Sequence, residues 1–139
     1  MSNSETSIIE KCLRESQSVA LVGASPKPEL ASNEIMDYLM KNNYKVYPIN
    51  PKYKGQLILG QLVYPDIISI PESIDMVDVF RPSPEAVEIT KQAIEKKVTY
   101  IWLQLGIENE EAKKIAEANG ITMIMNRCTL IEHKKLLTK

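Results

Sequence analysis

Five short apolar segments recur along the chain, and their spacing limits the possible folds more than any other property of the sequence. The first, residues 17–23, shows no polar alternation, which is typical of a strand buried on both faces. Similar segments follow at residues 45–50, 75–80, 98–103 and 121–125. Because the connections are too long for hairpins, these segments predict a Rossmann-like doubly wound α/β fold, with a mainly parallel five-stranded sheet and helices on both faces.

Start and stop signals place helices between these segments. Ser32 or Asn33 can cap a helix after the first strand, and Ser83 is expected to cap a helix that begins at Pro84. Another helix is expected over residues 109–119, because Gly120 directly after it is a typical helix end. Strands and helices therefore alternate along most of the chain.

The connection after the second strand has no helical period. Residues 51–71 contain glycines, prolines and a short extended piece at residues 61–64, so we expect an irregular crossover. Pro48, inside the second strand, predicts either an edge position or a missing ladder bond. A further helix over residues 6–15 is expected to pack before the first strand.

Length and charge limit the possible partners. A chain of 139 residues lies near the commonest domain size, so we expect residues 1–139 to form a single domain. The formal net charge of -1 does not favour binding to nucleic acid or to an anionic membrane surface. No segment has the pattern of a signal peptide or a membrane helix, so we expect a cytoplasmic protein.

The sequence offers few groups for catalysis or metal binding. Cys12 is expected in the core, and neither Cys12 nor Cys128 belongs to a CxxC pair, so we expect no disulfide and no zinc site. His133, the only histidine, lies among charged residues and is expected on the surface. A histidine-dependent triad then has no basis, and we predict no catalytic and no metal-binding residues.

The loop after the first strand is the first candidate for ligand binding. In open parallel sheets, ligands bind beyond the carboxyl ends of the strands, where helix N-termini and free backbone amides meet. Gly23, Ala24, Ser25 and Lys27 in this loop suit a phosphate group, although no glycine-rich phosphate-binding motif is present. A tight turn without a ligand is the alternative.

The loop after the second strand distinguishes between nucleotides. Folds that bind NAD usually carry an acidic residue there, whereas this chain has Asn50, Pro51 and Lys52. A lysine favours a nucleotide with an additional ribose phosphate, a description that fits both NADP and coenzyme A. A solvated lysine in a turn is the alternative.

Two further loops carry candidate residues. Phe80 and Arg81 precede a helix and suit an adenine ring or a pyrophosphate, although Arg81 could instead pair with Asp78 or with a neighbouring carboxylate. Gln104, at the end of the fourth strand, could bond a ligand amide or only the neighbouring backbone. The residues leave both choices open.

Taken in order, residues 22–28, 48–52, 77–81, 102–106 and 125–128 resemble the small CoA-binding-domain proteins. That family is similar to the amino-terminal CoA-binding domain of the succinyl-CoA synthetase α subunit. The resemblance implies a Rossmann-like fold that holds coenzyme A. It also implies a set of contacts: Gly23, Ala24, Ser25 and Lys27 around the pyrophosphate, Lys52 beside Asn50 and Pro51 at the 3′-phosphate, Phe80 and Arg81 along the nucleotide, and Leu103, Gln104 and Leu105 at a further strand end.

The chain departs from the family pattern at Asn126, where many small relatives carry aspartate, so we expect no role that needs a carboxylate there. The second domain of the synthetase, with its phosphorylated histidine, has no counterpart in these residues. Ligase activity of this chain alone is therefore not expected.

The sequence thus predicts a stand-alone protein that binds coenzyme A or an acyl-CoA without independent catalysis, with a protein partner left open. Two alternatives remain, an NADP-dependent oxidoreductase and a regulatory or partner domain with a vestigial nucleotide cleft. Cys128 is expected either to pack as a buried thiol or to lie on the ligand rim, where it could form a mixed disulfide with the thiol of coenzyme A.

Overall fold

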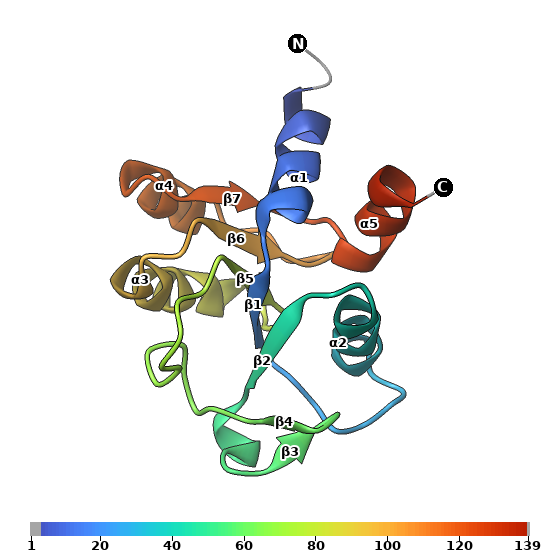
Figure 1. The fold of residues 1–139 in the computed structure, drawn as a ribbon. Helices are drawn as coiled ribbons and strands as arrows, with labels where there is room; N and C mark the ends of the chain where they lie inside the picture. The colour runs from blue at the N-terminus through green and yellow to red at the C-terminus, as the bar shows by residue number, and fades with distance from the viewer. Residues whose placement is uncertain (1–3, 139) are drawn as a thin grey trace.

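Five parallel strands form the central sheet of the computed structural model, which describes residues 4–138 (Figure 1). Their order is β2-β1-β5-β6-β7, so the order reverses at β1, which lies between β2 and β5. This arrangement confirms the predicted Rossmann-like α/β fold. The strands span Ser18–Val22 (β1), Lys45–Ile49 (β2), Met76–Val79 (β5), Tyr100–Leu103 (β6) and Thr122–Ile124 (β7).

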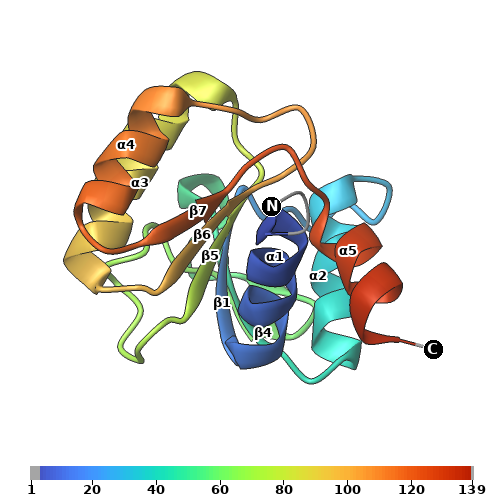
Figure 2. The same ribbon diagram turned by 90° about the horizontal axis from the view of Figure 1, so that it is seen from above.

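Helices cover both faces of the sheet, as predicted (Figure 2). One layer contains α1 (Ser4–Glu15), α2 (Ala31–Lys41) and α5 (Thr129–Leu137), and the other contains α3 (Ala86–Lys96) and α4 (Glu110–Ala118). No helix within residues 4–138 is both long enough and apolar enough to cross a membrane.

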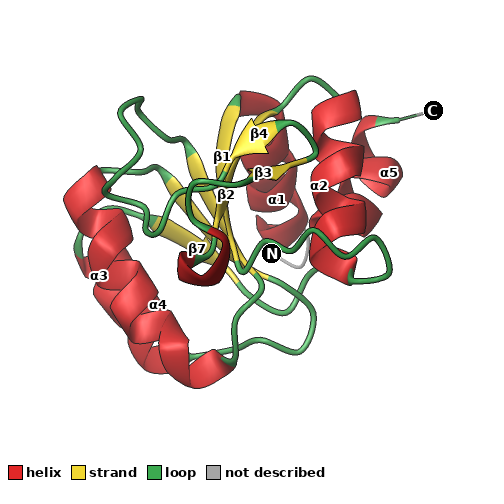
Figure 3. Cartoon of the chain, turned by 90° about the horizontal axis from the view of Figure 1, so that it is seen from below, coloured by secondary structure: helices red, strands yellow, loops and turns green. Residues whose placement is uncertain are grey.

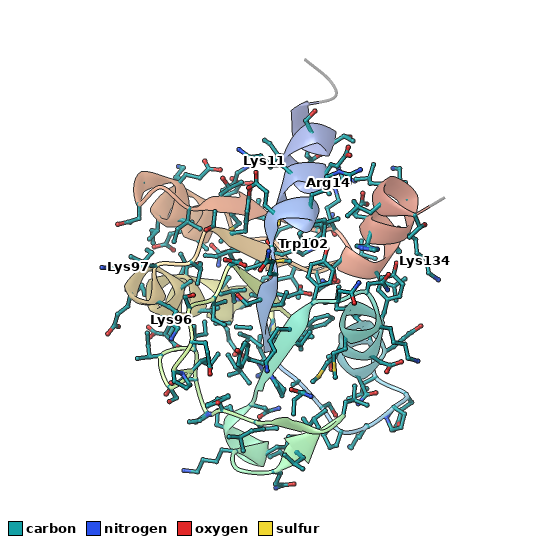
Figure 4. The ribbon with its side chains drawn as sticks, viewed as in Figure 1. Lys11, Arg14, Lys96, Lys97, Trp102 and Lys134 are labelled. Atoms are coloured by element: carbon teal, nitrogen blue, oxygen red, sulfur yellow. The ribbon has the colours of Figure 1, made fainter. Side chains whose placement is uncertain are left out.

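Each strand divides its side chains between the two faces of the sheet, because successive side chains point in opposite directions. Val19 and Leu21 of β1 pack beneath α1, α2 and α5, whereas Ala20 and Val22 pack against α3 and α4. Trp102 of β6 is fully buried on the first side and lies near the centre of the view in Figure 4. Burial of one large apolar side chain stabilises the fold by roughly 1.5–3 kcal/mol.

The connection between β2 and β5 contains a hairpin that the sequence did not predict. Strands β3 (Leu57–Ile58) and β4 (Gln61–Leu62) pair antiparallel, and the turn between them places Leu59 and Gly60 at positive φ (48° and 79°). Leucine is unusual in such a turn, which is why no hairpin signal was visible. The hairpin lies at the bottom of Figure 1 and toward the viewer in Figure 3.

The proline in β2 agrees with the strand's position. β2 is one of the two edge strands of the five-stranded sheet, which is one of the two alternatives that Pro48 predicted. Beyond the hairpin, Tyr64 returns beside this edge and forms a parallel bridge with Ile49. This bridge brings the residues after Tyr64 to the carboxyl end of β2.

The expected helix cap at Ser32 or Asn33 is wrong. Helix α2 begins at Ala31, and Leu30 occupies the N-cap position without a side-chain hydrogen bond. Asn33 is buried and its Nδ2 donates to the carbonyl oxygen of Ser25, 2.8 Å away. The side chain that suggested a cap therefore holds the loop after β1.

Ser83 is not a side-chain cap either. Residues Ser83–Glu85 form a short 3-10 helix before α3, so the α-helix begins two positions after Pro84. The Ser83 hydroxyl accepts a hydrogen bond from the backbone nitrogen of Glu108 at 3.0 Å. The predicted helix after β6 is confirmed, and the side chain of Asn109 caps it by accepting from Ala112 N at 3.0 Å.

The expectation that His133 lies on the surface is wrong. Helix α5 includes this residue and turns it toward α2, so that only 6% of it is exposed. Its Nδ1 lies 2.8 Å from the Tyr38 hydroxyl, and the Tyr38 and Tyr44 rings contact it edge-on. Burial lowers the pKa of His133. Cys12 is fully buried, as expected, and Cys128 is buried in the same core.

Candidate functional site

The candidate loops leave the sheet from a single row of residues. Val22 pairs with Ile49 on one side and Val79 on the other, and Val79 pairs with Leu103. The residues that follow these partners therefore lie side by side along the carboxyl edge, in the order Asn50, Gly23, Phe80, Gln104.

Gly23 makes the turn that ends β1. Its φ is +93°, and a Cβ built on it would lie 2.8 Å from the carbonyl oxygen of Phe80. The backbone nitrogens of Gly23 and Ala24 both donate to the carbonyl oxygen of Ile49, at 3.0 and 3.2 Å. Both the backbone conformation and the close approach of β5 therefore require glycine here.

The loop after β1 is held from two sides. Asn33 of α2 bonds the carbonyl oxygen of Ser25, as described above, and Asn50 Nδ2 donates to the carbonyl oxygen of Ala24 at 2.9 Å. Within the loop, the Ser25 hydroxyl accepts from Lys27 N at 3.1 Å. These contacts fix the backbone of the loop without using the Lys27 side chain.

Asn50 also shapes the next loop. Its Oδ1 accepts from the backbone nitrogen of Lys52 at 3.0 Å, which starts a 3-10 helix over Pro51–Tyr53. The side chain of Lys52 is exposed, and its Nζ lies 5.4 Å from the centre of the Tyr53 ring. A single asparagine thus connects the two loops that the sequence singled out.

Two adjoining pockets lie at this edge, and we call them together the groove. The smaller has a volume of about 470 Å³ and the larger about 660 Å³, within the usual range of ligand sites. Gly23, Asn50, Lys52 and Arg81 line both. The groove therefore lies where the strand order reverses, between the ends of β2, β1 and β5.

The structure gathers the predicted residues of the first three loops around this groove. The smaller pocket is lined by Gly23, Ala24, Ser25, Lys27, Asn50, Lys52, Phe80 and Arg81, and Pro51 lines the larger one.

The predicted residues of the fourth loop line neither pocket. Leu103 is fully buried against α3 and α4, and Leu105 is 59% exposed. Gln104 is 5% exposed and forms its hydrogen bonds in the interior.

Arg81 lies between the two pockets, and its guanidinium binds Glu85 through two hydrogen bonds of 3.0 and 2.8 Å. This pairing with a neighbouring carboxylate is one of the alternatives that the sequence left open, and Asp78 is not the partner. The hydrogen bond raises the pKa of Arg81 and lowers the pKa of Glu85. Both side chains remain nearly half exposed, so the pair is accessible to solvent.

Several groove residues were missed in the sequence. Tyr53 and Leu30 line the smaller pocket, and Pro65, Asp66 and Ile67 line the larger. The last three reach the groove because Tyr64 bridges back to β2, a long-range pairing that has no local signal.

Asp78, Gln104 and Thr129 form a second polar group, which we call the buried polar cluster. Gln104 Nε2 donates to Asp78 Oδ1 at 2.6 Å and to Thr129 Oγ1 at 2.9 Å, and Thr129 Oγ1 donates to Asp78 Oδ2 at 3.1 Å. Burial raises the pKa of Asp78 to about 7, and the hydrogen bonds from Gln104 and Thr129 oppose that shift. A lone aspartate within an apolar strand was the available sequence signal.

Asn126 has a structural role in this arrangement. It adopts a φ of +59°, a conformation that asparagine tolerates, and its Oδ1 accepts from Gly106 N at 2.7 Å. The position at which the chain departs from the family pattern therefore supports the turn after β6.

A doubly wound parallel sheet with a groove at its switch point defines the class of Rossmann-like domains, in which ligands usually bind at this edge. The chain belongs to the CoA binding domain family, whose sequence model matches residues 17–134. The family resemblance inferred from the sequence is thereby confirmed.

Individual relatives agree with this family. A hypothetical protein from Pyrococcus horikoshii OT3 has a TM-score of 0.89 and 41% identity, covering 94% of this chain and 91% of that chain. The uncharacterized protein YneT of Bacillus subtilis (strain 168) is 29% identical over 133 residues, which are 96% of this chain and 97% of that protein. An ADP-forming acetate–CoA ligase of Archaeoglobus fulgidus is 33% identical over 120 residues, which are 79% of this chain but 17% of the ligase.

Proposed function

We propose that this chain is a stand-alone protein that binds coenzyme A or an acyl-CoA in the groove and has no catalytic activity of its own. The observation that carries the proposal is that Lys52 lines the same groove as the loop after β1, which Asn33 and Asn50 hold in place. One bound ligand could then contact both the backbone amides of that loop and the Lys52 side chain after β2. Membership of the CoA binding domain family supports coenzyme A over NADP.

The chemistry of the groove suits the parts of coenzyme A in a definite order. The turn at Gly23 and the start of α2, where Ala31 and Ser32 line the smaller pocket, offer a site for the pyrophosphate. Lys52, which lines both pockets, would meet the 3′-phosphate. Phe80 and Arg81 would border the nucleotide. The resemblance to part of a protein named acetate–CoA ligase is compatible with a protein partner.

The absence of independent catalysis and a cytoplasmic location belong to the same proposal. His133 points from α5 toward Tyr38 of α2 and lines neither pocket of the groove, so it does not lie where a base for a bound ligand would be needed. Cys12 and Cys128 are free thiols, which agrees with a reducing compartment.

Calorimetry with coenzyme A and NADP tests the ligand. We expect coenzyme A to bind and NADP to bind much more weakly. Binding of NADP without coenzyme A at millimolar concentration would favour the oxidoreductase alternative. Binding of neither nucleotide would favour the vestigial cleft.

Lys52→Ala tests the proposed contact with the 3′-phosphate. The variant should weaken the binding of coenzyme A more than the binding of 3′-dephospho-CoA, by roughly 1.5–3 kcal/mol. The reason is that a charge-assisted hydrogen bond to the 3′-phosphate is lost only with coenzyme A. The matched control is Lys54→Ala, since Lys54 is also exposed but lines neither pocket. Equal losses of affinity for the two ligands would mean that Lys52 does not contact the 3′-phosphate.

A further inference from the structure

Helix α5, which lies beside α1 and α2 in Figure 2, is attached differently along its length. In its first turn, the Thr129 hydroxyl donates to the buried carboxylate of Asp78 in the sheet, at 3.1 Å. One turn further, His133 forms the hydrogen bond to Tyr38 of α2 at 2.8 Å. The last residue, Leu137, is only partly buried. The sheet therefore holds the first turn of α5, whereas the C-terminal half depends on His133 and its neighbours.

A pocket reaches His133 although the residue is buried. Ser16 and Tyr44 precede β1 and β2, so this pocket lies at the amino edge of the sheet, away from the groove. Its volume is about 280 Å³, which is enough for several water molecules. Water can therefore supply a proton to the imidazole. The pocket is lined by Leu13, Arg14, Ser16, Asn42, Asn43, Tyr44, His133 and Leu137.

The groups that face His133 from other elements offer no compensating negative charge. From α1, Arg14 lines the same pocket, and its Nε lies 2.8 Å from the Glu10 carboxylate. From α2 and the start of β2 come Tyr38 and Tyr44, whose pKa values are raised by burial, so both hydroxyls stay neutral. A protonated His133 would therefore meet a second cation in the pocket lining and no carboxylate there.

Helix α5 itself carries one charge of each sign beside His133. Lys134 Nζ lies 5.7 Å from the centre of the Tyr38 ring, on the side of α2. Glu132 is buried, but adjacent residues point about 100° apart around a helix, so its carboxylate leaves in a different direction. Burial accordingly lowers the pKa of His133, as expected for an imidazole without a compensating charge.

We propose that His133 is a pH-sensitive latch that holds the C-terminal half of α5 against α2 when the imidazole is neutral and releases it when the imidazole is protonated. The neutral ring packs between the Tyr38 and Tyr44 rings. The charged ring gains hydration only by moving out of this contact, and α5 must move with it. Thr129 still holds the first turn to Asp78, so the release is a local opening and not global unfolding. The latch does not depend on the proposed ligand.

The lowered pKa determines the direction of the effect. The closed latch binds a proton less strongly than the released state, in which His133 regains its ordinary pKa of 6.5. The latch is therefore closed above this pH, and release becomes more favourable as the pH falls below it. At pH 5 the release equilibrium can rise by at most about thirtyfold, the limit set by protonation of the released state alone.

Hydrogen exchange measures the release of α5. Between pH 7.5 and pH 5, the protection of the amides of residues 133–137, relative to those of α4 at the same pH, should fall about three- to thirtyfold. Helix α4 is the internal reference because it covers the opposite face of the sheet. In His133→Gln, whose amide can still bond Tyr38 but does not titrate, the ratio should stay within about twofold. Equal loss of protection in α4, or the same fall in His133→Gln, would overturn the proposal.

A measurement on the original protein keeps the latch testable if His133→Gln does not fold. The chain contains one histidine, so the Cε1–H signal in proton NMR belongs to His133 and should titrate below pH 6.5. A pKa at or above 6.5 would reject the latch. Tyr38→Phe is the matched control. It removes the hydrogen bond and should lower the protection of α5 at both pH values, but the fall in acid should remain because His133 still titrates.

Discussion

Two carboxylates of this domain hold their partners in opposite surroundings. Glu85 binds Arg81 between the pockets, where solvent reaches both side chains, while Asp78 binds Gln104 and Thr129 without any exposure. An exposed ion pair contributes about 0–1 kcal/mol, whereas a buried polar group left without a partner costs about 1–3 kcal/mol. The exposed contact can therefore exchange partners, and the buried one fixes the geometry around it.

The largest expected effect concerns the pH dependence of stability at Asp78. Its pKa in the folded protein, about 7, exceeds the ordinary value of 3.8, so the folded state retains a proton that the unfolded state releases. Stability of the original protein must then fall as the pH rises between these values. Asp78→Asn has no such proton, so its free energy of unfolding should rise relative to the original protein from about pH 4 to about pH 7.

Urea denaturation of both proteins at several pH values measures this difference. His133, whose pKa is lowered by burial, titrates in both proteins and cancels. A difference that stays flat across the interval would show that Asp78 is ionised throughout, and the contrast with Glu85 would then lose its basis.

A smaller effect is expected from Thr129→Val, which removes a hydroxyl that donates to the buried carboxylate. The loss should be about 1–3 kcal/mol, measured by urea denaturation. Thr90→Val is the matched control, because Thr90 is equally buried but its hydroxyl has no partner within residues 4–138. This control should leave the free energy of unfolding unchanged or raise it slightly. Similar losses of stability in both variants would mean that changed packing, and not the lost hydrogen bond, causes the effect.

The smallest expected effect on stability concerns the exposed Arg81–Glu85 pair. Glu85→Gln should change stability by less than about 0.5 kcal/mol and should strengthen coenzyme A binding about two- to fivefold, because Arg81 becomes free for a ligand phosphate. Glu10→Gln serves as control, since Glu10 forms a similar pair with Arg14 outside the groove. Weaker binding by Glu85→Gln would indicate that Glu85 orients Arg81 and does not compete with the ligand.

The parts of the fold that depend on local pattern could be predicted. Apolar runs and glycine signals were sufficient for the five strands, and the strand ends then located the loops at Gly23, Lys52 and Arg81, because parallel strands share one carboxyl edge. Pro48 indicated an edge position as one of two alternatives. These features depend on residues close together in the chain.

The rest depends on contacts that no local pattern reports. Thr129 lies 51 positions from the Asp78 that it contacts, and His133 is buried by Tyr38, 95 positions away. The hairpin turn at Leu59 uses a residue type that does not favour it. In each case tertiary packing overrode the composition of the neighbouring sequence.

The common level of the strand ends has a consequence for engineering. Because Asn50, Gly23, Phe80 and Gln104 stand in one row, we expect that the loops beyond this row can be lengthened or replaced without shifting the strand pairing beneath it, provided that Gly23 and Asn50 are kept. The sheet and its helix layers would then serve as an unchanged scaffold, and a change of ligand would require new loops but not a new core.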